Sequence, residues 1–145
     1  MSAVQLANRA VTNWKIAVAV RSGLAPWQEL NVVAFLTSGL GTAAPELIGE
    51  SYVDKSGRRY PPMLAHPVRA FGGDRAEVRR SFDRSLSRGL LVSVYTDEMF
   101  ATMNDADNRA VVARRDTADL SIAGFLAAGD ARQVDKAFDK IRLHS

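Results

Sequence analysis

The run Trp14–Arg21, followed by a glycine turn and a proline, constrains the fold of this chain more than any other feature. Its centre, from Ile16 to Val20, is apolar at every position, which is typical of a strand covered on both faces of a sheet. Gly23 and Pro26 then indicate a turn and the first turn of a helix, where a proline loses no hydrogen bond. In open α/β sheets, ligands bind beyond the carboxyl ends of strands, so this strand-to-helix junction predicts the place of a site.

Length and composition are those of an ordinary globular chain. With 145 residues, 47% apolar and 24% charged, it fits an N-terminal arm over residues 1–13 and a single domain over residues 14–145. The sequence has no cysteine, which excludes disulfides, thiol nucleophiles and cysteine metal sites and favours the cytoplasm. No apolar run approaches the ~20 residues of a membrane span, and residues 1–13 lack the pattern of a signal peptide. We therefore expect a cytoplasmic domain that does not enter a membrane.

The charge balance is mildly basic, with a net charge of +3 and an isoelectric point near 9.6. This balance permits a phosphate-bearing partner such as RNA without requiring one. Arg80, Arg84 and Arg88 recur four residues apart, and like charges at this spacing slightly destabilise a helix. Such a row of arginines can bind a phosphate backbone. More commonly it belongs to a helix face that is exposed to solvent.

The helix predicted over residues 27–40 is apolar almost all round, as Leu30 and Phe35 illustrate. A helix of this kind is buried on more than one side. We therefore expect another layer of the fold, or another subunit, to cover it. Gly39 and Gly41 are expected to end it.

The rest of the chain alternates strand and helix patterns. A turn cluster at Asp54–Gly57 indicates a hairpin over residues 46–60, and Pro61-Pro62 places this hairpin at a sheet edge. A helix over residues 74–88 carries a buried stripe. That stripe consists of Val78, Phe82 and Leu86. Further strands are expected over Val68–Phe71, Leu90–Tyr95 and Leu120–Leu126. Further helices are expected over residues 97–103, 106–114 and 130–141. This order favours an α/β sandwich around one mixed sheet.

Motifs that would identify an activity are lacking. The sequence has no glycine-rich phosphate loop, no nucleophile elbow and no metal-ligand spacing, so it predicts no cofactor and no metal. His66 and His144 are far apart in the chain and are interpreted as structural or surface histidines.

Polar residues instead gather where two predicted strands end. Arg21 ends the first strand, and Thr96 and Asp97 follow the strand over residues 90–95, so parallel strands would bring these groups to one edge of the sheet. An arginine beside a helix N-terminus suits an anion. The candidate site comprises the catalytic residues Asp97 and Thr96 and the ligand-binding residues Arg21, Trp27, Gln28 and Asn31. The simpler interpretation is an Arg21–Asp97 ion pair with a threonine or aspartate helix cap.

Several segments resemble known proteins. Three of them resemble the first strand, the Thr-Asp pair and the last helix of type II peptidyl-tRNA hydrolases: Lys15–Leu24, Thr96-Asp97 and Val134–Leu143. Three others make nearly the whole chain similar to a bacterial family of unknown function that shares the hydrolase fold: Leu24–Asn31, Tyr60–Leu64 and Tyr95–Phe100. The resemblance implies a three-layer α/β/α domain with a mixed sheet of at least four strands, often found as a homodimer.

The chain departs from the hydrolases where their first helix begins. Those enzymes have a Gly-Lys-Gly-Lys run where this chain has Trp27-Gln28-Glu29-Leu30, and Thr37 stands where they carry a histidine. Losing both lysines removes charge that would hold a phosphate and stabilise a developing oxyanion. Thr96 and Asp97 alone remain of that catalytic set.

Three hypotheses follow from these residues. We favour a small-ligand or RNA-related binding domain, in which Arg21 and Trp27 line a pocket. The second is a divergent hydrolase of peptidyl-tRNA or of another ester or amide, with Asp97 orienting water. The third is self-association through the apolar first helix. Convergence of Arg21, Trp27 and Asp97 in one open cleft would discriminate among them.

Overall fold

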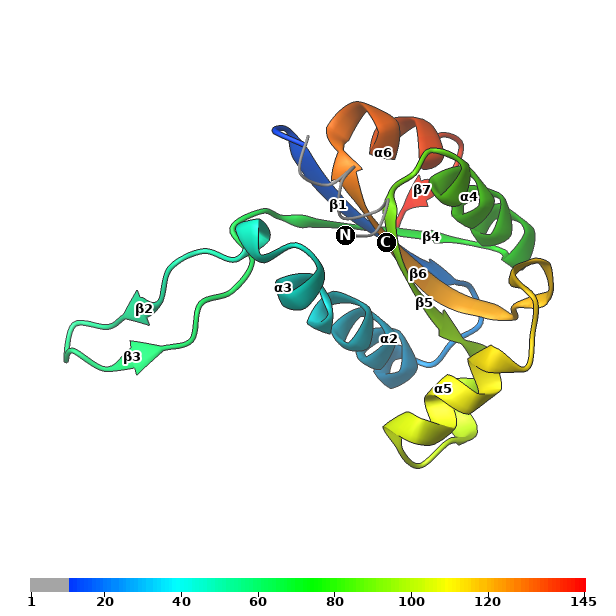
Figure 1. Cartoon of the computed structure of the whole chain (residues 1–145), viewed down its shortest axis with the longest axis horizontal. Coiled ribbons are helices and arrows are strands. Elements are labelled where there is room, and N and C mark those ends of the chain that lie inside the picture. The colour runs from blue at the N-terminus through cyan, green and yellow to red at the C-terminus, as the bar shows by residue number, and fades with distance from the viewer. Residues whose placement is uncertain (1–10) are drawn as a thin grey trace.

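A computed structural model describes residues 11–145, in which helices cover both faces of one central sheet (Figure 1). Five strands form this sheet in the order β5-β6-β1-β4-β7. They are β1 (Trp14–Arg21), β4 (Val68–Gly73), β5 (Leu91–Thr96), β6 (Ile122–Asp130) and β7 (Arg142–Leu143). The helices are α2 (Pro26–Ser38), α3 (Leu40–Ala43), α4 (Arg75–Ser87), α5 (Asp105–Ala113) and α6 (Ala131–Ala137), with short 3-10 turns η1 (Pro45–Leu47), η2 (Asp97–Ala101) and η3 (Thr117–Asp119). The predicted mixed α/β fold is confirmed; residues 1–10 of the predicted N-terminal arm lie outside the described residues.

Strand directions decide which residues share an edge of the sheet. β1 pairs with β4 in parallel, whereas β6 runs antiparallel to both β1 and β5. β5 therefore runs in the direction of β1, and the carboxyl ends of β1, β4 and β5 lie at the same edge. β7 returns antiparallel along β4 and brings the last residues of the chain to this edge.

The buried run of β1 divides its side chains between two cores. Ile16, Val18 and Val20 face the layer formed by α2 and α3. Ala17 and Ala19 face the layer formed by α4 and α6. All five are buried, which confirms that this strand is covered on both faces.

The helices agree less well with the sequence pattern. α2 was expected to be buried on more than one side, but only Val32 and Leu36 are fully buried, whereas Leu30 is 73% and Phe35 57% exposed. The Phe35 ring is partly covered by Tyr95 of β5, whose ring centroid lies 6.0 Å away. In α4, Val78 and Phe82 are buried as expected. Leu86, the last member of the stripe, is exposed because successive steps of four residues rotate it away from the buried face, on which Ser81 and Ser85 lie instead.

The chain after β6 also differs from the pattern. The last helix ends at Ala137 rather than near residue 141, and the chain turns through Lys140, whose φ is 65°, into β7. Phe138 and Ile141 are still buried against the α4 layer. Apolar spacing therefore identified the buried residues but not the end of the helix.

The predicted hairpin forms outside the main sheet. β2 (Tyr52–Val53) and β3 (Arg59–Tyr60) pair with each other alone, so the expected position at an edge of the main sheet is wrong. The segment extends away from the body (Figure 1), and every residue from 50 to 63 is exposed. We call residues 50–63 the arm. Its base is held by hydrogen bonds from Gly49 N to Met63 O (2.9 Å) and from Ala65 N to Leu47 O (2.8 Å).

Candidate functional site

The shared edge of the sheet brings Arg21 and Asp97 together. Arg21 is the last residue of β1, and Asp97 opens η2 directly after β5. Although β6 lies between these strands, Arg21 Nε donates to Asp97 Oδ1 at 2.8 Å. The ion pair that the sequence suggested is therefore present.

Both oxygens of Asp97 are occupied. Oδ2 accepts from Arg75 Nη1 at 2.7 Å and from the Ser121 hydroxyl, and the Asp97 N–H donates to Ser121 O at 2.9 Å. Burial raises the pKa of Asp97, but the hydrogen bonds from Ser121, Arg75 and Arg21, together with the Arg21 charge, outweigh burial and lower it. Asp97 is thus an ionised carboxylate that ties β5 to the start of α4 and the end of β1.

Thr96 does not cap the helical turn that follows it. Its side chain is buried, and Oγ1 has no hydrogen-bond partner among the described residues. Buried hydroxyls without a partner are uncommon in folded proteins. The threonine half of the simpler interpretation is therefore not observed.

The other predicted ligand-binding residues lie on the first two turns of α2. Gln28 Oε1 accepts from the Ala25 N–H at 2.9 Å, so this side chain satisfies a free donor at the start of the helix. Trp27 is 60% exposed, and its ring meets the Phe100 ring edge-on at 6.5 Å. Trp27 and Asn31 line a hollow of about 300 Å³ between α2 and the η2–α5 segment. We call it the aromatic hollow; its walls also include Phe35, Tyr95, Met99, Phe100, Met103 and Asp105.

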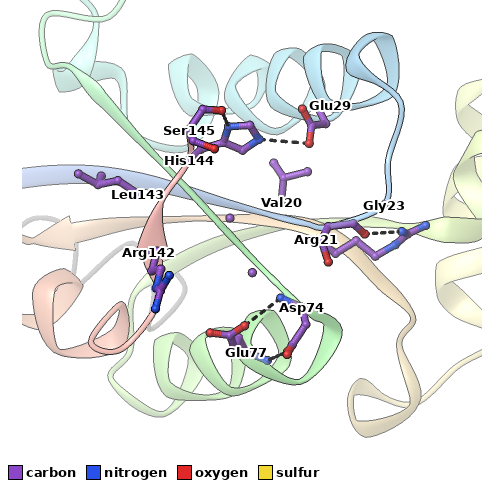
Figure 2. Close-up of a pocket in the computed structure, with 13 residues that line it drawn as sticks. Val20, Arg21, Gly23, Glu29, Asp74, Glu77, Arg142, Leu143, His144 and Ser145 are labelled. Atoms are coloured by element: carbon purple, nitrogen blue, oxygen red, sulfur yellow. Dashed lines mark hydrogen bonds and ion pairs between the residues drawn. The ribbon is translucent and has the colours of Figure 1, made fainter.

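A larger pocket, of about 670 Å³, opens between the carboxyl ends of β1 and β4 (Figure 2). β1 continues into α2 on one face of the sheet, and β4 continues into α4 on the other. The two connections diverge between adjacent parallel strands, and this divergence is the place where open α/β sheets bind ligands. We call this cavity the switch pocket; its walls include Arg21, Ser22, Gly23, Glu29, Gly72, Gly73, Asp74, Glu77, Arg142 and His144.

His144 closes one side of the switch pocket. Its N–H donates to Ala70 O at 2.9 Å, which continues the β7–β4 pairing, and its ring Nε2 lies 3.1 Å from Glu29 Oε1 on α2 (Figure 2). A Cβ on Gly72 would lie 3.3 Å from His144 Cδ2, so the glycine leaves space for the ring. The hydrogen bond that His144 donates to the Glu29 carboxylate raises the pKa of His144; burial opposes this, while the Glu29 charge and the Ser145 carbonyl add to it.

Charges of both signs line the switch pocket. Arg21 and Arg142 supply cationic groups, as does His144 when it is protonated, and Glu29, Asp74 and Glu77 supply carboxylates. Several are engaged within the protein: Arg21 binds Asp97, His144 binds Glu29, and Asp74 and Glu77 form the reciprocal cap of α4. Arg142 has no ion-pair partner among the described residues.

The predicted site residues therefore do not share one cleft. Arg21 lines the switch pocket, Trp27 and Asn31 line the aromatic hollow, and Asp97 lies in the wall of neither. Arg75 and Ser121 were missed around Asp97, although Arg75 stands just past a strand end and could have been found there. Glu29 and His144 approach each other only because the chain returns along β4, and nothing in the sequence pattern indicates that return.

Two kinds of feature were not found within residues 11–145. No group of three or more His, Asp or Glu side chains is placed to hold a metal ion there. The same residues include no helix with the length and hydropathy of a membrane span.

Comparison with known proteins shows the family to which this chain belongs. The family model described as "Protein of unknown function (DUF2000)" matches residues 14–145. A solved structure of a protein of unknown function from Agrobacterium tumefaciens strain C58 is similar to this chain, with 39% sequence identity and a TM-score of 0.87, over 92% of this chain and 98% of that one. No curated protein matches the chain.

Proposed function

We propose that this chain, which belongs to the DUF2000 family, is a binding domain for a small polar ligand that occupies the switch pocket. The observation that carries the proposal is the position of the pocket between β1 and β4, where the connections to α2 and α4 diverge. Its volume of about 670 Å³ falls in the range of small-molecule sites. Gly23, Gly72 and Gly73 line the pocket and add no side chains that would fill it.

A pocket lined by charges of both signs favours a dipolar ligand. Arg142 can bind a carboxylate without giving up another ion pair. On the same side of the sheet edge, Glu77 uses one oxygen for the Asp74 N–H, so its carboxylate can also accept from an amine (Figure 2). A small molecule with one anionic and one cationic group, such as a free amino acid, matches this pair.

The RNA-related version of the hypothesis has less support. A phosphate backbone requires several cations that are free to bind it. The arginine ladder of α4 is already used, because Arg80 and Arg84 donate to the carbonyls of Lys140 and Asp139 at 3.3 and 3.2 Å. Arg88 donates to Gln133 Oε1 at 2.9 Å. These contacts join α4 to α6 and the turn after it.

A divergent hydrolase on a type II peptidyl-tRNA hydrolase-like fold is the second candidate. The unpartnered Thr96 hydroxyl next to Asp97 favours it. Against it, a carboxylate with a lowered pKa and two occupied oxygens is a weak general base. A peptidyl-tRNA hydrolysis assay, with a lysine-containing type II enzyme as positive control, tests this candidate. Turnover that an Asp97→Asn variant loses at a temperature where it is still folded would support it, and no turnover would leave the binding function.

The binding function is tested by a thermal-shift titration with free amino acids. We expect at least one to raise the melting temperature, and Arg142→Ala to weaken that effect at least tenfold, because the ligand carboxylate loses its cation. Arg132→Ala, an arginine on α6 outside the pocket, is the matched control and should change nothing. Amino acids stripped of their amine or carboxyl group should bind less well. Equal responses of wild type and Arg142→Ala would contradict the proposed site.

A further inference from the structure

The aromatic hollow is a second cavity, separate from the switch pocket, and the two share no lining residue. One wall of the hollow is a side of α2, because Trp27, Asn31 and Phe35 recur four residues apart along that helix. The η2–α5 segment forms the opposite wall. The hollow therefore runs along α2, between this helix and the segment that follows β5.

Four aromatic rings line the hollow in a continuous row. The Tyr95 ring lies between the two walls, with centroid distances of 6.0 Å to Phe35 and 5.0 Å to Phe100. The Phe100 ring in turn lies 6.5 Å from that of Trp27. Trp27 and Phe35 are each more than half exposed, so their rings remain accessible to a ligand. Accessible rings of this kind bind other flat rings by stacking.

The hollow also offers neutral hydrogen-bonding groups that lack partners. Tyr95 is only 7% exposed, yet its hydroxyl makes no hydrogen bond within the described part of the chain, and burial alone raises its pKa. A tyrosine hydroxyl this far buried ordinarily has a partner. The Asn31 amide is likewise unpaired among residues 11–145. Asn108 accepts from the Thr102 hydroxyl and keeps its NH₂ group free there. Hydroxyl and amide groups of this kind match the donors and acceptors on the edge of a nucleobase.

The charges around the hollow disfavour an ionic ligand. Asp105 is the one charged residue among the described residues of its lining, and its carboxylate is paired with Arg109 one turn later in α5. A phosphate or carboxylate would therefore meet no cation in this lining. A quaternary ammonium ion binds aromatic rings but cannot form hydrogen bonds, so it would leave the Tyr95 hydroxyl and the Asn31 amide unpaired.

From these observations we infer that the aromatic hollow binds a free nucleobase or nucleoside. The base stacks on the rings of Trp27 and Phe35, and its edge bonds to the Asn31 amide and the Tyr95 hydroxyl. The volume of about 300 Å³ lies at the lower end of small-molecule sites and suits one ring system without a long substituent. Trp27 and Asn31 are thus ligand-binding residues in a site apart from Arg21, and the inference does not depend on the ligand of the switch pocket.

Isothermal titration calorimetry of the full chain with adenosine, guanosine, cytidine and uridine tests the site. We expect at least one nucleoside to bind with a dissociation constant below about 1 mM. Trp27→Leu should weaken this binding about tenfold, because a stacking ring is lost. The matched control is Tyr52→Leu, which removes an exposed aromatic ring of the arm and should bind as the wild type does. Failure of all four nucleosides to bind, or equal weakening in both variants, would overturn the inference.

Related probes test the class of ligand. The 5′-monophosphate of the bound nucleoside should bind no more tightly than the nucleoside, because the described lining has no cation for the phosphate. Choline, a quaternary ammonium ion, should not bind. A monophosphate, or a short single-stranded RNA of the same base, that binds at least tenfold more tightly than the nucleoside would assign the hollow to a different ligand. Choline binding that Trp27→Leu abolishes would do the same.

Tryptophan fluorescence tests the location of the nucleoside and does not depend on how Trp27→Leu folds. The chain has two tryptophans, so Trp14→Phe leaves Trp27 as the single one. The nucleoside should quench Trp27 emission with the dissociation constant that calorimetry gives. In the reverse variant, Trp27→Phe, the remaining Trp14 lies at the start of β1 and should show no saturable change. Saturable quenching of Trp14, with none of Trp27, would contradict binding in the hollow.

Discussion

The two faces of the sheet are covered to different extents. On one face, α4 and α6 enclose a core around Phe125, whose ring stacks on Phe138 at 5.3 Å and meets Phe82 at 5.6 Å. On the other face, α2 buries Val32 and Leu36 but leaves its outer side in solvent. The comparison shows that apolar composition alone does not say what covers a helix. The α4 face is covered by helices of this chain, whereas the outer side of α2 is exposed.

The largest expected effect is on the α4 face. Phe125→Ala should reduce the free energy of unfolding by about 3–5 kcal/mol, because it removes a fully buried ring between two others. Phe35→Ala, the matched change on the outer side of α2, should cost less than about 1 kcal/mol. Urea unfolding of the two variants measures the difference. Similar losses for the two would contradict the contrast between the faces.

The next largest effect is expected at Asp97, which links the end of β1 to the start of α4. Asp97→Asn should cost roughly 3 kcal/mol, because it leaves Arg21, which leads to α2, and Arg75, which opens α4, without their anion. The lowered pKa gives the sign of the pH dependence. Asp97 stabilises the fold above its ordinary pKa of 3.8, and this contribution is lost as the pH falls through the lower folded value. Melting curves from pH 2 to 7 should show a weaker acid dependence for Asp97→Asn, and parallel curves would refute the role.

A smaller effect tests how closely α2 approaches the sheet. A Cβ on Gly124 of β6 would lie 2.7 Å from Val32 Cγ1 and 2.9 Å from the Ala19 carbonyl oxygen. Gly124→Ala should therefore cost about 1–3 kcal/mol through overpacking against backbone that cannot move. Gly129→Ala is the control, since its Cβ would meet only the flexible end of Leu90. Thermal melts should rank the first variant well below the second, and the reverse order would mean that α2 is not held this closely.

The smallest effect concerns the contact between α2 and the end of the chain. Glu29→Gln should lower the pKa of His144, since the hydrogen bond to the Glu29 carboxylate is the main cause of its rise. Protonated His144 stabilises the fold below its ordinary pKa of 6.5, and this contribution is lost as the pH rises through the higher folded value. An NMR titration of the ring protons measures the shift, with His66 as internal reference. An unchanged His144 titration in Glu29→Gln would show that the two side chains do not meet.

Sequence periodicity predicted the elements better than their surroundings. It placed β1 at Trp14–Arg21, α4 within one residue at each end, and the buried positions Val78 and Phe82. Periodicity could not show that the outer side of α2 is exposed, because the spacing of apolar residues does not indicate which of them another element will cover. β7 was missed because two paired residues carry no periodic signal.

The site was predictable only where strand ends mark it. The rule for parallel strands correctly brought Arg21 to Asp97. The sequence predicted a strand within β6 but did not indicate that it lies between β1 and β5. The same rule placed Trp27 near them, but its side chain lies on the side of α2 that faces η2 and α5. The direction in which a side chain leaves a helix depends on the turn before it, and sequence spacing alone did not resolve that direction.

The most direct test of the proposed function is an amide NMR titration of the isotope-labelled full chain with the amino acid that most raises its melting temperature. The account predicts shifts concentrated on the amides of Ser22, Gly23, Gly72, Gly73 and His144, saturating with the thermal titration. Shifts concentrated on Trp27, Met103 and their neighbours, or none beyond those of a control solute, would contradict it.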